Sequence, residues 1–111
     1  MIFITGPLYS GKRAFAQKLL GCTPEELERR AVWDIQDLAR DCPDLEALAD
    51  ECSRREIVIA VETGGGVVPA SPEERAAREA AGRLSCLLAE RAETVVRVFC
   101  GLPAVLKGSL P

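Results

Sequence analysis

The residues best placed to do chemistry form a loop near the N-terminus, Gly6-Pro7-Leu8-Tyr9-Ser10-Gly11-Lys12. The loop matches the phosphate-binding pattern Gly-x4-Gly-Lys, and it lies between an expected strand and an expected helix, as that pattern requires. Its glycines allow the backbone to curl so that several N–H groups point inward, and the helix N-terminus adds partial positive charge. We therefore expect residues 6–13 to bind the phosphates of a nucleotide, with a plain strand-to-helix turn as the alternative.

The residue after Lys12 departs from the full motif. The pattern has Ser or Thr there, whose hydroxyl ligates Mg²⁺, whereas this chain has Arg13, which cannot ligate a metal and would repel one. Ser10 could supply a hydroxyl from another position. Two cations at a helix N-terminus each cost about 0.3–1 kcal/mol, which a bound anion would offset. Tyr9 and Trp33 could stack on a base, although Trp33 also suits the core. Nucleotide binding is thus better supported than catalysis.

Two carboxylates and a glycine run complete the candidate site. Asp34 follows a short apolar segment and could hold Mg²⁺ through water, or be an ordinary exposed aspartate. Glu62 ends an apolar strand and could contact a metal, a ribose or an acceptor hydroxyl, or bond to loop amides instead. Gly64 and Gly66 permit close approach of the backbone to a ligand, or belong to a flexible loop. With Lys12, the two carboxylates are the candidate catalytic residues.

The elements that must position these residues alternate between strands and helices. We expect strands at residues 2–4, 31–34, 56–61 and 94–100, and helices at residues 12–20, 24–30, 45–52 and 73–91. Gly101-Leu102-Pro103 should end the last strand, and Lys107 should lie in a tail. Alternation of this kind predicts a parallel sheet with helices on both faces, in which sites gather at the carboxyl ends of the strands.

Length and composition restrict the classes of protein to which this chain could belong. A chain of 111 residues predicts a single domain, residues 1–111. Its net charge of −3 argues against a nucleic acid or a membrane surface as partner. No signal peptide or membrane span is evident, and five cysteines without CxxC spacing favour reduced thiols and a cytoplasmic location. The absence of histidine excludes any chemistry that needs one from this chain.

A known family shares several of these features in order. The stretch Ile57-Val-Ile-Ala-Val-Glu62-Thr-Gly64-Gly-Gly66-Val-Val-Pro69 resembles the strand and loop of the adenosylcobinamide kinase / adenosylcobinamide-phosphate guanylyltransferase family, which typically reads Asn-Glu-Val-Gly-x-Gly-Ile-Val-Pro. Residues 81–84 and 101–108 are similar to its C-terminal half, and the first loop matches apart from Arg13. Residues 32–38 are loosely similar. The resemblance covers about the first twenty residues and everything from residue 57 onward.

The resemblance implies a P-loop NTPase-like three-layer α/β sandwich with a small, mainly parallel sheet. It implies ATP or GTP as ligand, with Mg²⁺, and phosphorylation of the cobinamide hydroxyl in cobalamin biosynthesis. It also implies a corrinoid substrate and a homo-oligomer, often a trimer. Family members use a histidine to accept GMP, so the guanylyltransferase step is not expected by that route here. The alternative is a nucleotide- or phosphate-binding member without chemistry, acting as a sensor or partner subunit.

Overall fold

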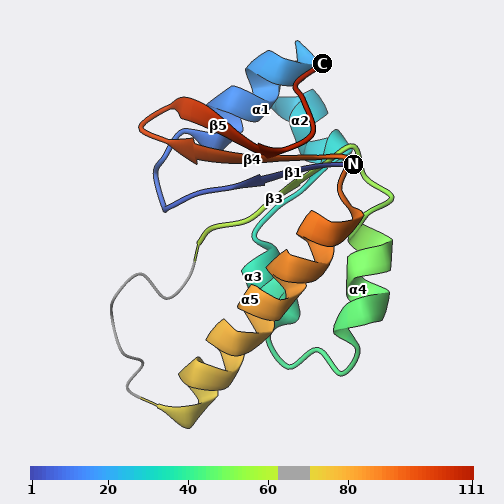
Figure 1. Cartoon of the computed structure of the whole chain (residues 1–111), viewed down its shortest axis with the longest axis vertical. Coiled ribbons are helices and arrows are strands. Elements are labelled where there is room, and N and C mark those ends of the chain that lie inside the picture. Colours follow the sequence, from blue (N-terminus) through green and yellow to red (C-terminus); the bar gives the residue numbers. More distant parts are fainter. Residues whose placement is uncertain (63–70) are drawn as a thin grey trace.

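A five-stranded sheet lies between two helical layers in the computed structural model, which describes residues 1–62 and 71–111 (Figure 1). The strands run in the spatial order β2-β3-β1-β4-β5, and the first four are parallel while β5 is antiparallel to β4. Their bounds are β1 (Ile2–Thr5), β2 (Ala31–Val32), β3 (Ile57–Ile59), β4 (Thr94–Phe99) and β5 (Leu102–Lys107). The predicted α/β class with a mainly parallel sheet is confirmed.

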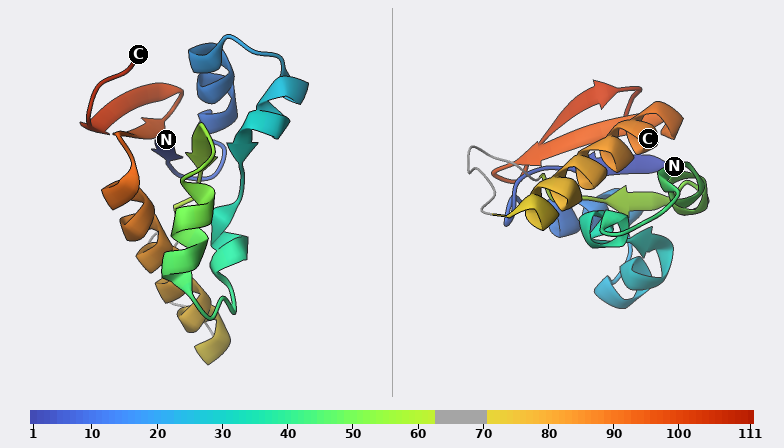
Figure 2. Two further views of the ribbon diagram at one scale, coloured as in Figure 1. Left: turned by 90° about the vertical axis from the view of Figure 1, so that its right-hand side faces the viewer. Right: turned by 90° about the horizontal axis from the view of Figure 1, so that it is seen from below.

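The helices divide between the two faces of the sheet (Figure 2). They are α1 (Lys12–Leu20), α2 (Pro24–Arg30), α3 (Ile35–Ala39), α4 (Leu45–Cys52) and α5 (Pro72–Arg91). Neighbouring residues of a strand point to opposite faces. Accordingly Ile4 packs in the core beneath α1 and α2, whereas Phe3 packs in the core beneath α3, α4 and α5. Both faces of the central strands are therefore covered, which explains why β3 is apolar without alternation.

Side-chain caps fix where several helices begin, as their sequences predict. The hydroxyl of Thr23 accepts a hydrogen bond from the Glu26 amide at 3.2 Å, and Ser71 accepts one from the Glu74 amide at the same distance. The carboxylate of Asp44 caps α4 in the same way. Such caps satisfy backbone donors that have no partner within the helix. The predicted helices at residues 12–20, 24–30, 45–52 and 73–91 are thereby confirmed to within one residue.

Two predictions about strands need correction near Asp34 and Glu62. The strand expected at residues 31–34 contains only Ala31–Val32, and the chain then turns into α3, a helix that was not predicted. Asp34 sits at the start of α3 with φ of 49°, so it is a left-handed residue that precedes a helix and not the extended last residue of a strand. The strand expected at residues 56–61 is also shorter, at Ile57–Ile59.

The strand that begins at Thr94 ends before Gly101, as predicted, but Leu102 and Pro103 begin a further strand, and the prediction that Lys107 lies in a tail is wrong. The chain reverses at Cys100 and Gly101, whose φ angles are 53° and 73°, and β5 then pairs with β4. Positive φ at both central residues suits a two-residue hairpin turn, because its twist matches that of the strands. The ammonium group of Lys107 donates hydrogen bonds to the carbonyls of Ala89 and Glu90 at 3.0 and 2.9 Å, which fixes β5 to the end of α5.

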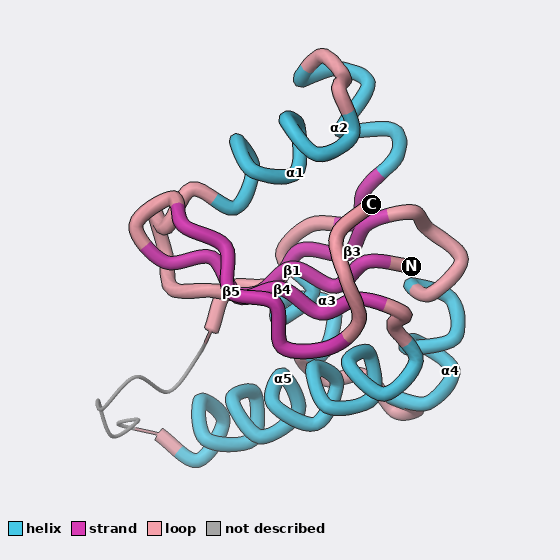
Figure 3. The backbone as a smooth tube through the Cα atoms, turned by 45° about the horizontal axis from the view of Figure 1, so that its top comes forward, coloured by secondary structure: helices cyan, strands magenta, loops and turns pink. Residues whose placement is uncertain are grey.

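The carboxyl ends of the parallel strands share one edge of the sheet. Figure 3 shows the loop after β1 and the turn between β4 and β5 on the same side of the molecule. From β1 the chain continues to α1 on one face, while the chain that leaves β3 reaches α5 on the other face. Connections that leave neighbouring strands toward opposite faces open a crevice between them, where ligands of α/β proteins bind. Within the described residues, no helix is long and apolar enough to cross a membrane.

Candidate functional site

The loop between β1 and α1 is curled by residues with positive φ. Gly6, Tyr9 and Gly11 have φ angles of 155°, 59° and 92°. A Cβ atom at position 6 would collide with the carbonyl oxygen of Val98, and one at position 11 would lie 3.2 Å from the Cα of Gly101. Position 6 therefore requires glycine for space as well as for backbone conformation, whereas position 11 favours glycine through its positive φ and a tight contact with the β4–β5 turn.

Backbone hydrogen bonds tie the two ends of this loop to the neighbouring strands. The carbonyl of Gly6 accepts from the amide of Glu62, just beyond β3, at 2.9 Å. The carbonyl of Ser10 accepts from the amide of Gly101, at the β4–β5 turn, at 2.8 Å. The predicted meeting of these features at the carboxyl edge of the sheet is thus confirmed for the described residues. The loop is held by the fold from both sides.

Lys12 folds back into the loop that precedes it. Its ammonium group donates to the carbonyl of Pro7 at 2.6 Å and lies 3.4 Å from the hydroxyl oxygen of Ser10. Only 7% of the residue is exposed. This burial lowers the pKa of Lys12 below the ordinary value of a lysine, while the negative charges of Glu62 and Asp34 oppose that shift. A charged group is costly to bury unless it is paired, so the ammonium is held where an anion would stabilise it.

A cleft of about 600 Å³ opens over this lysine. It is lined by residues 8–14 together with Trp33, Asp34, Ile59 and Val61. The structure thus brings Lys12, Arg13 and Asp34 to one cavity, as the topology predicts. Leu8 and Tyr9 are largely exposed, Tyr9 at 94%, and are available to a ligand above the loop. Gly64 and Gly66 lie outside the described residues.

Glu62 lies beside the cleft and is engaged by an arginine. Its carboxylate accepts two hydrogen bonds from the guanidinium of Arg97 on β4, at 2.6 and 3.1 Å. These bonds lower the pKa of Glu62, and burial opposes that effect only in part. Glu62 is therefore an ionised carboxylate paired with Arg97. The sequence reasoning missed Arg97, although a single charged residue in the apolar strand Thr94-Val-Val-Arg-Val-Phe99 was a usable signal.

Asp34 contributes to the cleft a carboxylate that is available to a ligand. It is exposed, it precedes α3, and it makes no side-chain cap to that helix. Because Asp34 adopts a left-handed conformation, the chain can turn sharply from Trp33 into α3. Its negative charge acts on Lys12, which places the two side chains within electrostatic reach of each other.

Arg13 packs on the ring of Trp33. The guanidinium carbon lies 4.3 Å from the centroid of the indole, a distance typical of a cation–π contact. Trp33 is half-buried and packs against the core beneath α1 and α2, as expected for a core residue. Its Nε1 is buried and has no hydrogen-bond partner within residues 1–62 and 71–111. The arginine that replaces Ser or Thr of the motif is thus held on one face by a fixed ring.

The donors around the cleft do not fit the Mg²⁺ arrangement that the first loop would ordinarily provide. Mg²⁺ takes oxygen ligands in octahedral geometry, from one or two carboxylates, phosphates and water, and in P-loop sites from a hydroxyl after the lysine. Here a guanidinium occupies that position, and the Ser10 hydroxyl faces Lys12. Among the described residues, no group of three or more His, Cys, Asp or Glu side chains could hold a metal ion. The available chemistry favours an anion.

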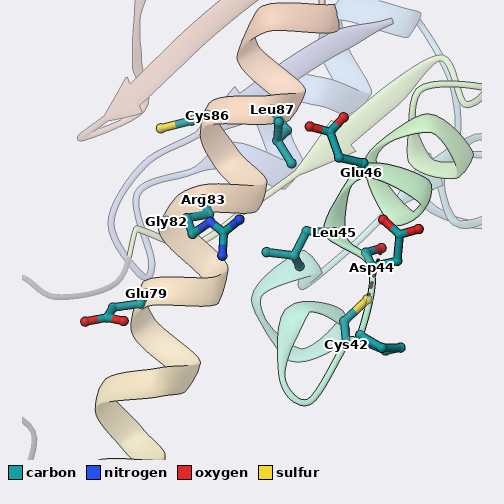
Figure 4. A pocket seen from close by; sticks show the side chains of 10 residues that line it. Cys42, Asp44, Leu45, Glu46, Glu79, Gly82, Arg83, Cys86 and Leu87 are labelled. Carbon is teal, nitrogen blue, oxygen red and sulfur yellow. Dashed lines mark hydrogen bonds between the residues drawn. The ribbon is translucent and has the colours of Figure 1, made fainter.

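A larger cleft of about 790 Å³ lies between α5 and the start of α4 (Figure 4). Residues 42–46 form one side, and Glu79, Gly82, Arg83, Cys86 and Leu87 form the other. None of the candidate catalytic or phosphate-binding residues lines it. The smaller cleft is therefore the candidate site, because it alone of the two contains the curled loop and Lys12.

Comparison with known protein families gives a match for the part of the chain that follows the first loop. A family model described as "Cobinamide kinase / cobinamide phosphate guanyltransferase" matches residues 22–106 of the 111. The match contains Trp33, Asp34, Glu62 and Arg97 but begins after the first loop, so the resemblance expected over the first twenty residues lies outside it. No curated protein matches the chain. Since the model covers well over half of the sequence, this chain belongs to the cobinamide kinase / cobinamide phosphate guanyltransferase family.

Proposed function

We propose that this chain is a P-loop nucleotide-binding member of its family, with residues 6–13 as the site for the phosphates of ATP or GTP. One observation carries the proposal: the buried ammonium of Lys12 lies inside a curled loop at the N-terminus of α1. The first turn of α1 contains no acidic residue, and no side-chain hydrogen bond caps it. Amides and a lysine arranged in this way bind anionic oxygens. Gly64 and Gly66 are proposed to approach the same ligand.

The proposed reaction is transfer of the terminal phosphoryl group to the cobinamide hydroxyl. The bond between that phosphorus and its bridging oxygen breaks, which leaves the nucleoside diphosphate, and a bond to the acceptor oxygen forms. Lys12 offsets the charge on the transferring group, as positioned cations do in phosphoryl transfer. Asp34 takes the hydroxyl proton, and Glu62, fixed by Arg97, stabilises the loop through its amide. No histidine is present, so no transfer of GMP through histidine is proposed.

Turnover with a purified sample tests this proposal. The protein is incubated with ATP or GTP and cobinamide, with and without MgCl₂, and the corrinoid product is measured by mass spectrometry. A gain in mass of one phosphate that Lys12→Ala abolishes supports the kinase. A sample that binds nucleotide, as shown by calorimetry, but transfers no phosphate in either buffer contradicts it.

Arg13 favours a second candidate function, a nucleotide- or phosphate-binding subunit without chemistry that acts as a sensor or partner. The residue that would hold the catalytic metal is replaced by a cation, and that cation is stacked on Trp33. Arg13→Ser discriminates between the two functions. A variant that gains turnover, starting from an inactive parent, identifies a disabled kinase, whereas turnover by the parent chain excludes the second function.

The proposed assembly is a homo-oligomer, and the resemblance implies a trimer. Its support is β5, an edge strand whose six residues are all exposed. The apolar side chains of Leu102 and Leu106 are 71% and 62% exposed, and an exposed apolar edge strand is a ready surface for another copy. Sedimentation velocity of the parent and of the double variant Leu102→Lys, Leu106→Lys tests this. A parent that sediments as a monomer at micromolar concentration contradicts it.

A further inference from the structure

We propose that the phosphate site works without a divalent cation, because Arg13, held on Trp33, supplies the positive charge that a hydroxyl-bound Mg²⁺ would otherwise bring. The inference rests on the proposed nucleotide site and specifies its ligand as a metal-free polyphosphate. It follows from the disagreement between the donors present and the metal that the family fold implies.

The contact with Trp33 occupies one face of the Arg13 guanidinium and leaves the N–H donors at its edge available. A guanidinium is a planar fork with five N–H donors at its edge, and its face can stack on an aromatic ring. With the guanidinium carbon 4.3 Å from the ring centroid, the indole occupies the face. The edge remains for paired hydrogen bonds to phosphate oxygens, which arginine makes in a bidentate manner. Stacking also restricts a flexible side chain before the ligand arrives, which reduces the entropy lost on binding.

The position of Arg13 directs this edge to the phosphates. Arg13 follows Lys12 directly in the first turn of α1, and both residues line the same cleft as the loop. The indole of Trp33, on which the guanidinium stacks, follows β2 and packs on the core beneath α1 and α2. The sheet therefore fixes the position of this ring. A ligand in the cleft therefore meets Lys12 and Arg13 together.

The balance of charge in the cleft also opposes a metal. Lys12 and Arg13 are two cations at a helix N-terminus, and Asp34 is the one carboxylate among the described lining residues. Glu62, the next carboxylate, is already bound at both oxygens by Arg97. A metal ion would add two positive charges beside a guanidinium that cannot ligate it. A triphosphate without bound Mg²⁺ carries more negative charge than its magnesium complex, and so matches this cleft better.

Calorimetric titration with and without metal tests the inference. ATP and inorganic tripolyphosphate are titrated into the full chain in EDTA and in excess MgCl₂. We expect the parent chain to bind at least as tightly in EDTA as in MgCl₂. Arg13→Ser, which restores the motif hydroxyl, should bind at least about tenfold more weakly in EDTA, since a charge-assisted hydrogen-bond pair is lost, and should bind more tightly when Mg²⁺ is added.

Two further variants and the comparison of the two buffers show which proposal a negative result would overturn. Trp33→Leu removes the indole on which Arg13 stacks and should weaken binding in EDTA. Arg54→Ser changes an exposed arginine outside the cleft and should bind as the parent does. Parent binding that is tenfold tighter in MgCl₂ than in EDTA overturns the metal-free site and leaves the nucleotide site standing. Absence of binding in both buffers overturns the proposed nucleotide site itself. The parent comparison decides the matter even if a variant fails to fold.

Discussion

The ammonium group of Lys12 donates a hydrogen bond to the carbonyl of Pro7 at 2.6 Å, so the lysine closes the loop that leads into its own helix. This contact holds a positive charge inside the curve of the backbone before any ligand is bound. A ligand then loses little free energy to rearrangement of the site. The arrangement is the physical basis of the proposed function.

Lys12→Met should weaken nucleotide binding strongly while retaining the fold. Methionine keeps an unbranched apolar stem in a position that is 7% exposed, and it removes only the donor. We expect at least about a tenfold loss of affinity for ATP, because a hydrogen bond from a charged group contributes about 1.5–3 kcal/mol. Calorimetry and circular dichroism provide the two readouts. Unchanged affinity in a folded variant would move the phosphate site elsewhere.

Raising the pH should change stability and binding in opposite directions through Lys12. Because burial lowers its pKa, the unfolded chain binds more protons than the folded one between that lowered pKa and 10.5. Stability of the parent relative to Lys12→Met therefore rises with pH across this window. Affinity for phosphate falls across the same window, because the ammonium loses its proton. Urea denaturation and calorimetry at several alkaline pH values check both slopes, and two slopes of the same sign would contradict the assignment.

Two glycine-to-alanine substitutions should have opposite effects on stability. Gly6→Ala places a Cβ against the carbonyl of Val98 at a φ of 155°, so we expect a loss of about 2 kcal/mol or more. Gly82→Ala lies within α5, where an added Cβ meets nothing within 4 Å, and should gain roughly 0.5–1 kcal/mol. Urea denaturation of the two variants measures this contrast. Equal effects would mean that the loop is not held against β4.

Loss of the carboxylate at Glu62 should weaken the fold at neutral pH and not in acid. Arg97 lowers the pKa of Glu62, so this pair contributes stability above the ordinary pKa of a glutamate, 4.5, and loses it as the pH falls through the lowered value. Glu62→Gln should therefore be modestly less stable than the parent at pH 7 and equal to it once the pH lies below the lowered pKa of Glu62. The effect is small because both side chains are partly exposed. A difference that persists in acid would point to a cause other than this ion pair.

Local chemistry made much of the fold predictable. Thr23, Asp44 and Ser71 each precede a helix that they cap, and Gly21 ends α1 in the left-handed conformation that favours glycine. The site loop could be recognised because its glycines, its lysine and its place after a strand carry the information locally. The parallel order of the strands then predicted which loops would meet at one edge.

What could not be predicted depends on contacts between distant residues. Helix α3 is only five residues long and lacks a side-chain cap, so no local signal marked it. Strand β5 contains Pro103 and is stable only because β4 provides its hydrogen-bond partners. The pairing of Glu62 with Arg97 spans 35 residues of sequence. The contact of Arg13 with Trp33 likewise depends on how β2 and α1 meet.

Two-dimensional ¹⁵N–¹H NMR during titration with ATP is the sharpest test of the proposed phosphate site, because it reports on the loop amides themselves. We expect the amides of Ser10, Gly11, Lys12 and Arg13 to shift most, in EDTA as well as with MgCl₂, and Lys12→Met to reduce these shifts at the same ATP concentration. Shifts confined to residues of the cleft between α4 and α5, or no shifts in the loop at saturating ATP, would contradict it.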